Sequence, residues 1–262
     1  MLKSRKIGIC FNINKVIRIK MTFSDNTLFD KKEIYKISCS KKGKLQELAS
    51  LSKSKRSKLE ENNMHLTEGM VYSETNGFPI LKPYNGSVNL SYQPFTKRQK
   101  LDGKGVALHF FMDDYKFSAA CDTNLERTTY SLIKFDCLLT PDYSLYVDMP
   151  LEMNRHNIFR SRFAGAFWQN CGFNVIPTAS WSDADSFDYC FEGLPSNSVI
   201  GVCGTGIKWC SASYRLWQYG MRAMEERISP TTIIVYGSAL EVPGLHTPIV
   251  FIQDYISKHY RR

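Results

Sequence analysis

Three aspartates follow short hydrophobic runs, at the points where strands of an α/β fold would end. Asp113 comes directly after Val106–Met112, Asp142 follows Phe135–Leu139, and Asp183 follows a third run at a longer distance. Carboxylates that meet from separate strand ends can divide acid and base roles, or can bind Mg²⁺ or Mn²⁺ through their oxygens. We therefore predict Asp113, Asp142 and Asp183 as catalytic residues, with Asp113 and Asp142 as metal ligands.

Each of these aspartates also has a simpler explanation. Asp is a preferred residue at helix N-caps, and its charge is favourable at the start of a helix. Asp113 and Asp114 are adjacent, so within a strand they would point to opposite faces and only one of them could join a given site. The sequence leaves helix capping and catalysis open.

A glycine-containing segment, Gly201–Lys208, follows a fourth hydrophobic run and precedes a helical pattern. Backbone N–H groups exposed in such a turn can receive a phosphate, so we predict Gly204, Thr205 and Gly206 as ligand- or phosphate-binding residues. The segment is not a Walker A loop, because Lys208 is not adjacent to the last glycine and no Ser or Thr follows it. It also lacks the third glycine of the dinucleotide fingerprint. A tight turn is the alternative.

Two aromatic residues and a serine end their runs at the same predicted edge. The rings of Trp181 and Tyr236 can stack on a base or sugar there, although packing is the commoner role of such rings. Ser238 completes the predicted ligand-binding set but lacks the G-x-S-x-G elbow, and no histidine stands where a hydrolase triad can be argued.

Five hydrophobic runs alternate with helical patterns, which predicts parallel strands joined by crossover helices. The two clearest helices are expected at Pro150–Cys171 and Ser211–Ile228. Parallel strands place their carboxyl ends at one edge, where open α/β folds and barrels bind ligands. The predicted fold is α/β with a mostly parallel sheet, and an incomplete or irregular TIM-like barrel is left open. The runs are Val106–Met112, Phe135–Leu139, Phe173–Ile176, Ser198–Val202 and Thr231–Tyr236.

The net charge of +9 is unevenly distributed along the 262 residues. Residues 1–105 contain 21 Lys and Arg against 9 Asp and Glu, whereas residues 106–262 contain 13 against 16. We therefore predict a basic N-terminal extension over 1–105, with a helix near 41–63, and an α/β domain over 106–262. Such a basic arm can bind phosphates, and a solvated helix face is the alternative. The predicted nucleic-acid-binding residues are Lys53, Lys55, Arg56 and Lys58.

The cysteines and the hydropathy pattern bear on the compartment. The 8 cysteines include no C-x-x-C pair and no disulfide-style spacing, which argues against a zinc ribbon and favours a reducing cytoplasm. The apolar segment Ile7–Phe11 is too short for a signal peptide. No run of about 18 apolar residues exists to span a membrane, so no membrane partner is expected.

Several segments in consistent order resemble an uncharacterised bacterial and phage family, the domain of unknown function numbered 4417. The resemblance covers roughly residues 106–240. It implies an association with phages, plasmids and integrated elements, and it carries no agreed activity. The segments are His109–Phe117, Leu139–Pro150, Gly172–Trp181, Phe191–Pro195 and Ile234–Gly237.

Two functional hypotheses follow. In the first, the chain is a nucleic-acid-associated accessory protein of a mobile element, with a ligand pocket in its α/β domain. In the second, it is a metal- or phosphate-dependent enzyme that acts on a nucleotide-like substrate at the strand C-terminal edge. Mg²⁺ or Mn²⁺ is the expected cofactor of the enzyme, and neither the reaction nor the oligomeric state is predicted.

Overall fold

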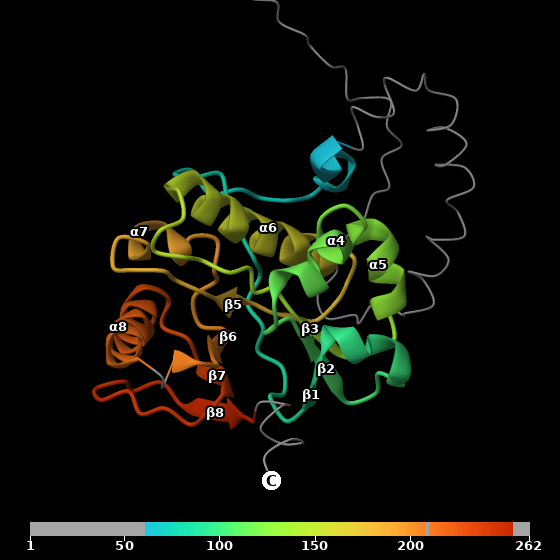
Figure 1. Ribbon diagram of the computed structural model, residues 1–262. Helices are drawn as coiled ribbons and strands as arrows, with labels where there is room; N and C mark the ends of the chain where they lie inside the picture. The colour runs from blue at the N-terminus through green and yellow to red at the C-terminus, as the bar shows by residue number, and fades with distance from the viewer. Residues whose placement is uncertain (1–60, 208–209, 254–262) are drawn as a thin grey trace, which may run out of the picture.

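Two parallel four-stranded sheets form the centre of the computed structural model, which describes residues 61–207 and 210–253 (Figure 1). In both sheets the strands follow one another in chain order, and the predicted parallel α/β fold is confirmed. The predicted helix near 41–63 and the basic extension before residue 61 lie outside the described residues. The strands are β1 (Ser91–Pro94), β2 (Val106–His109), β3 (Cys137–Leu139), β4 (Val175–Ile176), β5 (Thr178–Ala179), β6 (Val199–Gly204), β7 (Thr232–Gly237) and β8 (Ile249–Ile252).

Two long helices cross over between strands, close to where the sequence predicts them. α6 (Leu151–Asn170) connects β3 to β4, and α8 (Ser211–Ile228) connects β6 to β7. The shorter helical elements are η2 (Glu61–Leu66), η3 (Phe95–Lys100), η4 (Asp114–Lys116), α4 (Ser118–Cys121), α5 (Leu125–Leu132) and α7 (Phe187–Cys190).

The two sheets meet at a single proline, Pro177, which separates β4 from β5. Proline has no N–H and cannot continue the hydrogen-bond ladder. The hydroxyl of Thr140, the residue after β3, accepts the N–H of Thr178 at 2.8 Å and lies 2.7 Å from the Thr178 hydroxyl. The N–H of Thr140 itself still bonds Ile176 O at 3.1 Å. The Thr140 hydroxyl therefore serves as the acceptor for Thr178 N–H and links the end of β3 to the start of β5.

The inner faces of both sheets share one apolar cluster, which contains Ala107 of β2, Leu139 of β3, Ile176 of β4 and Ile234 of β7. Helices cover the outer faces: Met221 of α8 is buried over β6 and β7. Chain-ordered parallel strands around a common inner cluster resemble a barrel. Among the described strands, the order runs from β1 to β4 and from β5 to β8 without closing the ring.

Residues ahead of position 106 also belong to this packed unit. β1 pairs in parallel with β2, with Ser91 opposite Val106. Phe78, Leu81 and Phe95 are buried in the clusters under the helices. Part of the segment that the sequence assigns to the extension therefore supplies a strand and core side chains to the α/β unit.

Close contact between α6 and β3 gives a test of this packing. A Cβ atom on Gly165 would lie 2.5 Å from Thr140 Cγ2 and 3.0 Å from Leu81 Cδ2. In an open helix, Gly→Ala stabilises by roughly 0.5–1 kcal/mol. Here we expect Gly165→Ala to lower the free energy of unfolding by about 1–3 kcal/mol, because the core is overpacked. Urea unfolding measures the change, with His156→Ala on the exposed face of α6 as control. A stabilised Gly165→Ala protein would contradict the packing.

Candidate active site at the strand C-terminal edge

The threonine pair at the sheet junction places two polar side chains next to each other. Asp142 lies two residues beyond Thr140, and Ser180 lies two residues beyond Thr178. The Ser180 hydroxyl donates a hydrogen bond to an Asp142 carboxylate oxygen. The junction thus brings Asp142, which is half-buried, into contact with the end of a strand in the other sheet.

The environment of Asp142 changes its acidity. The pKa of Asp142 is raised to about 7, chiefly by burial and also by the charge of Asp114. The hydrogen bond from Ser180 and the charge of Arg162 act in the opposite direction, lowering the pKa. A carboxyl group with a pKa near 7 gives up and takes back a proton readily at neutral pH, which is a property of general acids and bases.

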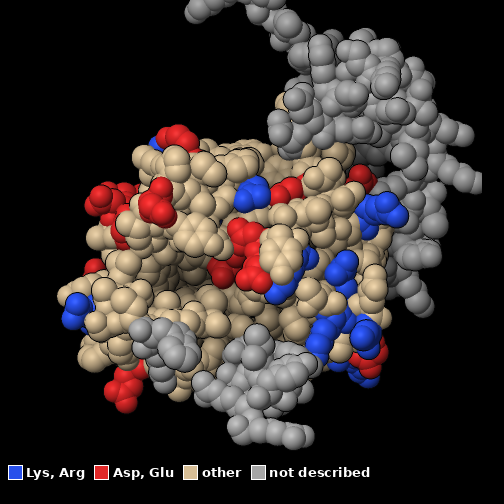
Figure 2. Space-filling view, in the orientation of Figure 1, with Lys and Arg blue, Asp and Glu red and all other residues tan. Residues whose placement is uncertain are grey.

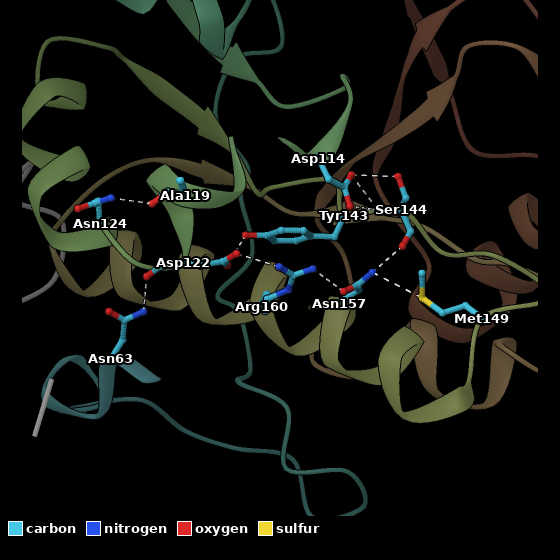
Figure 3. Close-up of polar contacts among 10 residues, drawn as sticks. All are labelled: Asn63, Asp114, Ala119, Asp122, Asn124, Tyr143, Ser144, Met149, Asn157 and Arg160. Atoms are coloured by element: carbon cyan, nitrogen blue, oxygen red, sulfur yellow. Dashed lines mark hydrogen bonds and ion pairs between the residues drawn. The ribbon is translucent and has the colours of Figure 1, made fainter. Parts of the chain in front are cut away.

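Asp114 reaches the same edge from the neighbouring strand end. It follows β2 and accepts hydrogen bonds from Ser144, at 3.2 Å from the backbone N–H and 2.9 Å from the hydroxyl (Figure 3). Ser144 itself follows β3. The Asp114 carboxylate therefore joins the two loops that follow neighbouring strands.

Helix α6 fixes the loop that contains Ser144. Asn157 Nδ2 donates to Ser144 O at 2.7 Å, and Asn154 Nδ2 donates to Tyr146 O at 3.0 Å. Arg160 adds an ion pair with Asp122 at 2.8 Å, as Figure 3 shows. The contacts of Asn157 and Asn154 with this loop hold the position of Asp114 through Ser144.

A buried cation lies close to this group. Arg162 of α6 is 1% exposed and donates to three backbone carbonyls: Thr178 O at 3.0 Å, Cys190 O at 2.8 Å and Glu192 O at 3.3 Å. Burial lowers the pKa of Arg162 to about 10, while the charge of Asp142 opposes that shift. The guanidinium is satisfied by carbonyl oxygens and acts on Asp142 through its charge.

The other two predicted catalytic aspartates make local contacts. The Asp113 side chain is 63% exposed and forms an ion pair with Lys116 at 2.6 Å. Asp183 accepts the N–H of Ser186 at 2.9 Å, in the turn before α7. The carboxylate whose charge acts on Asp142 is that of Asp114 rather than that of Asp113 or Asp183.

The metal prediction rests on a small set of ligands. Across residues 61–207 and 210–253, no group of three or more His, Cys, Asp or Glu side chains is placed to hold a metal ion. Asp114 and Asp142 supply carboxylate oxygens, which suit Mg²⁺ or Mn²⁺. Such an ion would need water or substrate oxygens to complete its coordination, as Mg²⁺ commonly does.

The predicted phosphate-binding segment is a turn after β6. A Cβ atom on Gly204 would lie 2.9 Å from Val235 Cγ1, so this glycine permits close packing of β6 on β7. Gly206 has φ +78°, which favours glycine, and has open space beside it. Thr205 is exposed. Phosphate binding by this turn stays a prediction.

The predicted aromatic ligands are held by packing. Trp181 lies against α8, where a Cβ atom on Gly220 would meet its ring at 2.1 Å. Tyr236 stacks on Phe111 at 5.3 Å between ring centroids and lies 4.3 Å from His109 in the inner cluster. Ser238 is half-buried just after β7. The nucleic-acid-binding residues Lys53, Lys55, Arg56 and Lys58 lie outside the described residues.

Two exposed tyrosines beside the carboxylates are not among the residues predicted from sequence. Tyr115, next to Asp114, is 77% exposed, and Tyr146, two residues beyond Ser144, is 55% exposed. Figure 2 shows acidic side chains gathered near the middle of this face, beside a hollow in the surface. The edge therefore combines carboxylates with exposed rings.

The whole described α/β unit coincides with a known family. The model of "Domain of unknown function (DUF4417)" matches residues 70–255. The chain belongs to this family. The resemblance in the sequence covered a shorter part of the same region.

Two phage proteins are similar to this member of the family. The "Gene 1 protein" of Mycobacterium phage L5 is 38% identical over 146 residues, which are 56% of this chain and 63% of the phage protein. The "Gene 1 protein" of Mycobacterium phage D29 is 36% identical over 146 residues, 56% of this chain and 54% of the phage protein. The matched part thus spans less than two thirds of each relative. No solved structure matches the chain, and no described helix is long and apolar enough to cross a membrane.

The acidity of Asp142 has a consequence for stability. Its pKa is higher in the folded chain than the ordinary value near 3.9, so the folded state binds more protons between about pH 4 and pH 7. Stability should fall as pH rises through this window. We expect Asp142→Asn to remove the effect, worth up to about 4 kcal/mol. Urea unfolding at both ends of the window measures it.

The exposed aspartate Asp113 provides the control. Asp113→Asn removes one exposed carboxylate from the loop that follows β2 and should leave the pH dependence of unfolding close to that of the original chain. An equal pH dependence in the Asp142→Asn variant would show that Asp142 titrates at its ordinary pKa.

Proposed function

We propose that this DUF4417 protein is an enzyme that carries out acid–base chemistry at the strand C-terminal edge, with Asp142 as the proton-transferring group. The observation that supports it best is the meeting of Asp142 and Asp114 from neighbouring strand ends, with the pKa of Asp142 raised to about 7. Ligand sites of α/β folds lie at this edge of the sheet.

The surrounding residues have distinct roles in this proposal. Asp142 accepts a proton from the substrate or returns one, and the Ser180 hydroxyl orients its carboxylate. Asp114, held by Ser144, keeps the pKa of Asp142 high. Arg162 limits that increase with its buried charge, so that both protonation states of Asp142 are available near neutral pH.

The exposed residues around Asp114 and Asp142 favour a nucleotide-like substrate. Tyr115 and Tyr146 offer exposed rings on which a base can stack, at about 1–3 kcal/mol per base. The turn at Thr205 and Gly206 offers exposed backbone after a neighbouring strand. When bound, Mg²⁺ or Mn²⁺ would use the oxygens of Asp114 and Asp142 and would supply charge stabilisation to a phosphate.

Turnover of simple phosphate esters tests the enzyme. The probes are ATP and bis(p-nitrophenyl) phosphate, assayed with Mg²⁺ or Mn²⁺. We expect Asp142→Asn to lower kcat/KM by about 10²–10⁴-fold, because the proton-transfer group is removed. Asp113→Asn, the exposed neighbour, should retain the rate. The pH–rate profile should show a group titrating near pH 7, and Ser180→Ala should move it upward. Unchanged kinetics in Asp142→Asn, or no turnover of either probe, would contradict the proposal.

A second function has its own support: a nucleic-acid-associated accessory role in a phage or another mobile element. The support comes from the phage relatives and from the basic residues concentrated in 1–105. A reducing cytoplasm, favoured by the spacing of the cysteines in the sequence, is the compartment proposed for it. In this role the strand-edge pocket binds a ligand without turning it over.

Substitution in the basic arm tests the accessory role. In the full chain, Lys53→Ser, Lys55→Ser, Arg56→Ser and Lys58→Ser together remove four positive charges. We expect weaker binding to a labelled DNA duplex and a flatter salt dependence. The slope of log K against log salt should fall by about 0.9 for each phosphate that the arm no longer neutralises. Fluorescence anisotropy measures both. An unaltered affinity and slope would rule out this arm as the DNA-binding segment.

A further inference from the structure

A basic surface lies on the connection between β1 and β2, away from the carboxylates of the candidate active site. Figure 2 shows Lys and Arg side chains gathered on one side of the face, apart from the acidic centre. Two carboxylates, Asp102 and Asp136, lie in the same stretches of chain. The cations of this basic surface are Lys97, Arg98 and Lys100 of η3, Lys104 before β2, and Lys134 before β3.

Contacts within this surface fix Arg98 and join Lys134 to the loop after η3. Lys134 Nζ donates to Leu101 O. Gly103, with φ +93°, is packed so tightly that a Cβ atom there would lie 2.3 Å from Lys134 O. The Arg98 guanidinium lies 4.0 Å from the centre of the Phe95 ring, and Phe95 is buried. The loop after η3 and the turn before β3 therefore form one continuous surface.

The carboxylates within the basic surface do not cancel its charge. Asp136 accepts the N–H of Gly105 at 2.6 Å, and Asp102 accepts the N–H of Lys104 at 3.3 Å. Both carboxylates are used to shape the loop. Five cations against two carboxylates leave a positive surface, which attracts a polyanion at moderate ionic strength.

The composition of the surface favours one kind of polyanion. No large hydrophobic side chain between Ile80 and Tyr115 is fully exposed, so this stretch presents no fully exposed ring for stacking. Proteins that bind single strands use such rings, whereas contacts to a duplex backbone need only cations and donors. In duplex DNA the phosphates face outward and the bases are stacked inside.

We propose that this basic surface binds the phosphate backbone of double-stranded DNA without reading its sequence. The inference rests on the accessory role proposed above and adds a folded contact surface to the predicted basic arm.

The test uses the full chain and a fluorescently labelled duplex of mixed sequence, titrated at several salt concentrations. The variant carries Lys97→Ser, Lys100→Ser and Lys104→Ser. We expect at least a tenfold loss of affinity at low salt. The slope of log K against log salt should fall by up to about 2.7, because each neutralised phosphate contributes about 0.9.

A matched control separates this surface from net charge. Lys82→Ser, Arg215→Ser and Arg227→Ser remove the same three charges from exposed positions elsewhere, and this variant should keep the original slope. Thermal unfolding checks that both triple variants fold. If the first does not, Lys100→Glu alone replaces it, because Lys100 is exposed.

The outcomes distinguish this inference from the role on which it rests. Equal slopes for the two triple variants, with the original chain binding DNA, would overturn the basic surface and leave the accessory role standing. No binding of the duplex by the original chain would overturn both. The same titration with a labelled single strand tests the choice of ligand. If the Lys97, Lys100 and Lys104 substitutions weakened binding to the single strand but not to the duplex, the choice of double-stranded DNA would be overturned.

Discussion

The side-chain pair Thr140 and Thr178 is the contact on which the candidate site depends. Pro177 interrupts the sheet, and a buried N–H without a partner at Thr178 would cost about 1–3 kcal/mol. The Thr140 hydroxyl supplies the partner. Because the segments after β3 and β4 stay in register across the junction, Asp142 and Ser180, each two residues further along, lie at the same edge. The position of Asp142 beside Ser180 therefore depends on the threonine contact next to Pro177.

Charge balance around Asp142 follows from the same arrangement. Arg162 donates to Thr178 O, so the junction that positions Asp142 also holds the cation that stabilises its ionised form. A buried guanidinium is costly unless its donors are satisfied, and three backbone carbonyls satisfy it here. The negative charge of Asp114, which follows the neighbouring strand β2, opposes Arg162 by raising the pKa of Asp142. The pKa of Asp142 reflects these opposing effects together with burial.

Much of the fold was predictable from hydrophobic pattern, and part of the site was not. The two long helices and the parallel strands follow from periodicity, and the place of Asp142 after a strand made it a candidate. Side-chain alternation along a strand could not decide whether Asp113 or Asp114 faces the site. The hydrophobic run continues to Met112, but β2 itself ends at His109. Side-chain alternation no longer applies once the chain has left the strand. The two-residue strand β5 and the contacts of Arg162 depend on tertiary packing, which no local pattern encodes.

Amide hydrogen exchange at Thr178 in a Thr140→Val variant tests the junction most directly, since valine keeps the shape of threonine and removes its hydroxyl. We predict that amide exchange at Thr178 becomes much faster in this variant, while the amide of Val202 in β6 keeps its protection. The pKa of Asp142 should change in the same variant. Protection at Thr178 equal to that of the original chain would show that the Thr140 hydroxyl does not hold the two sheets in register.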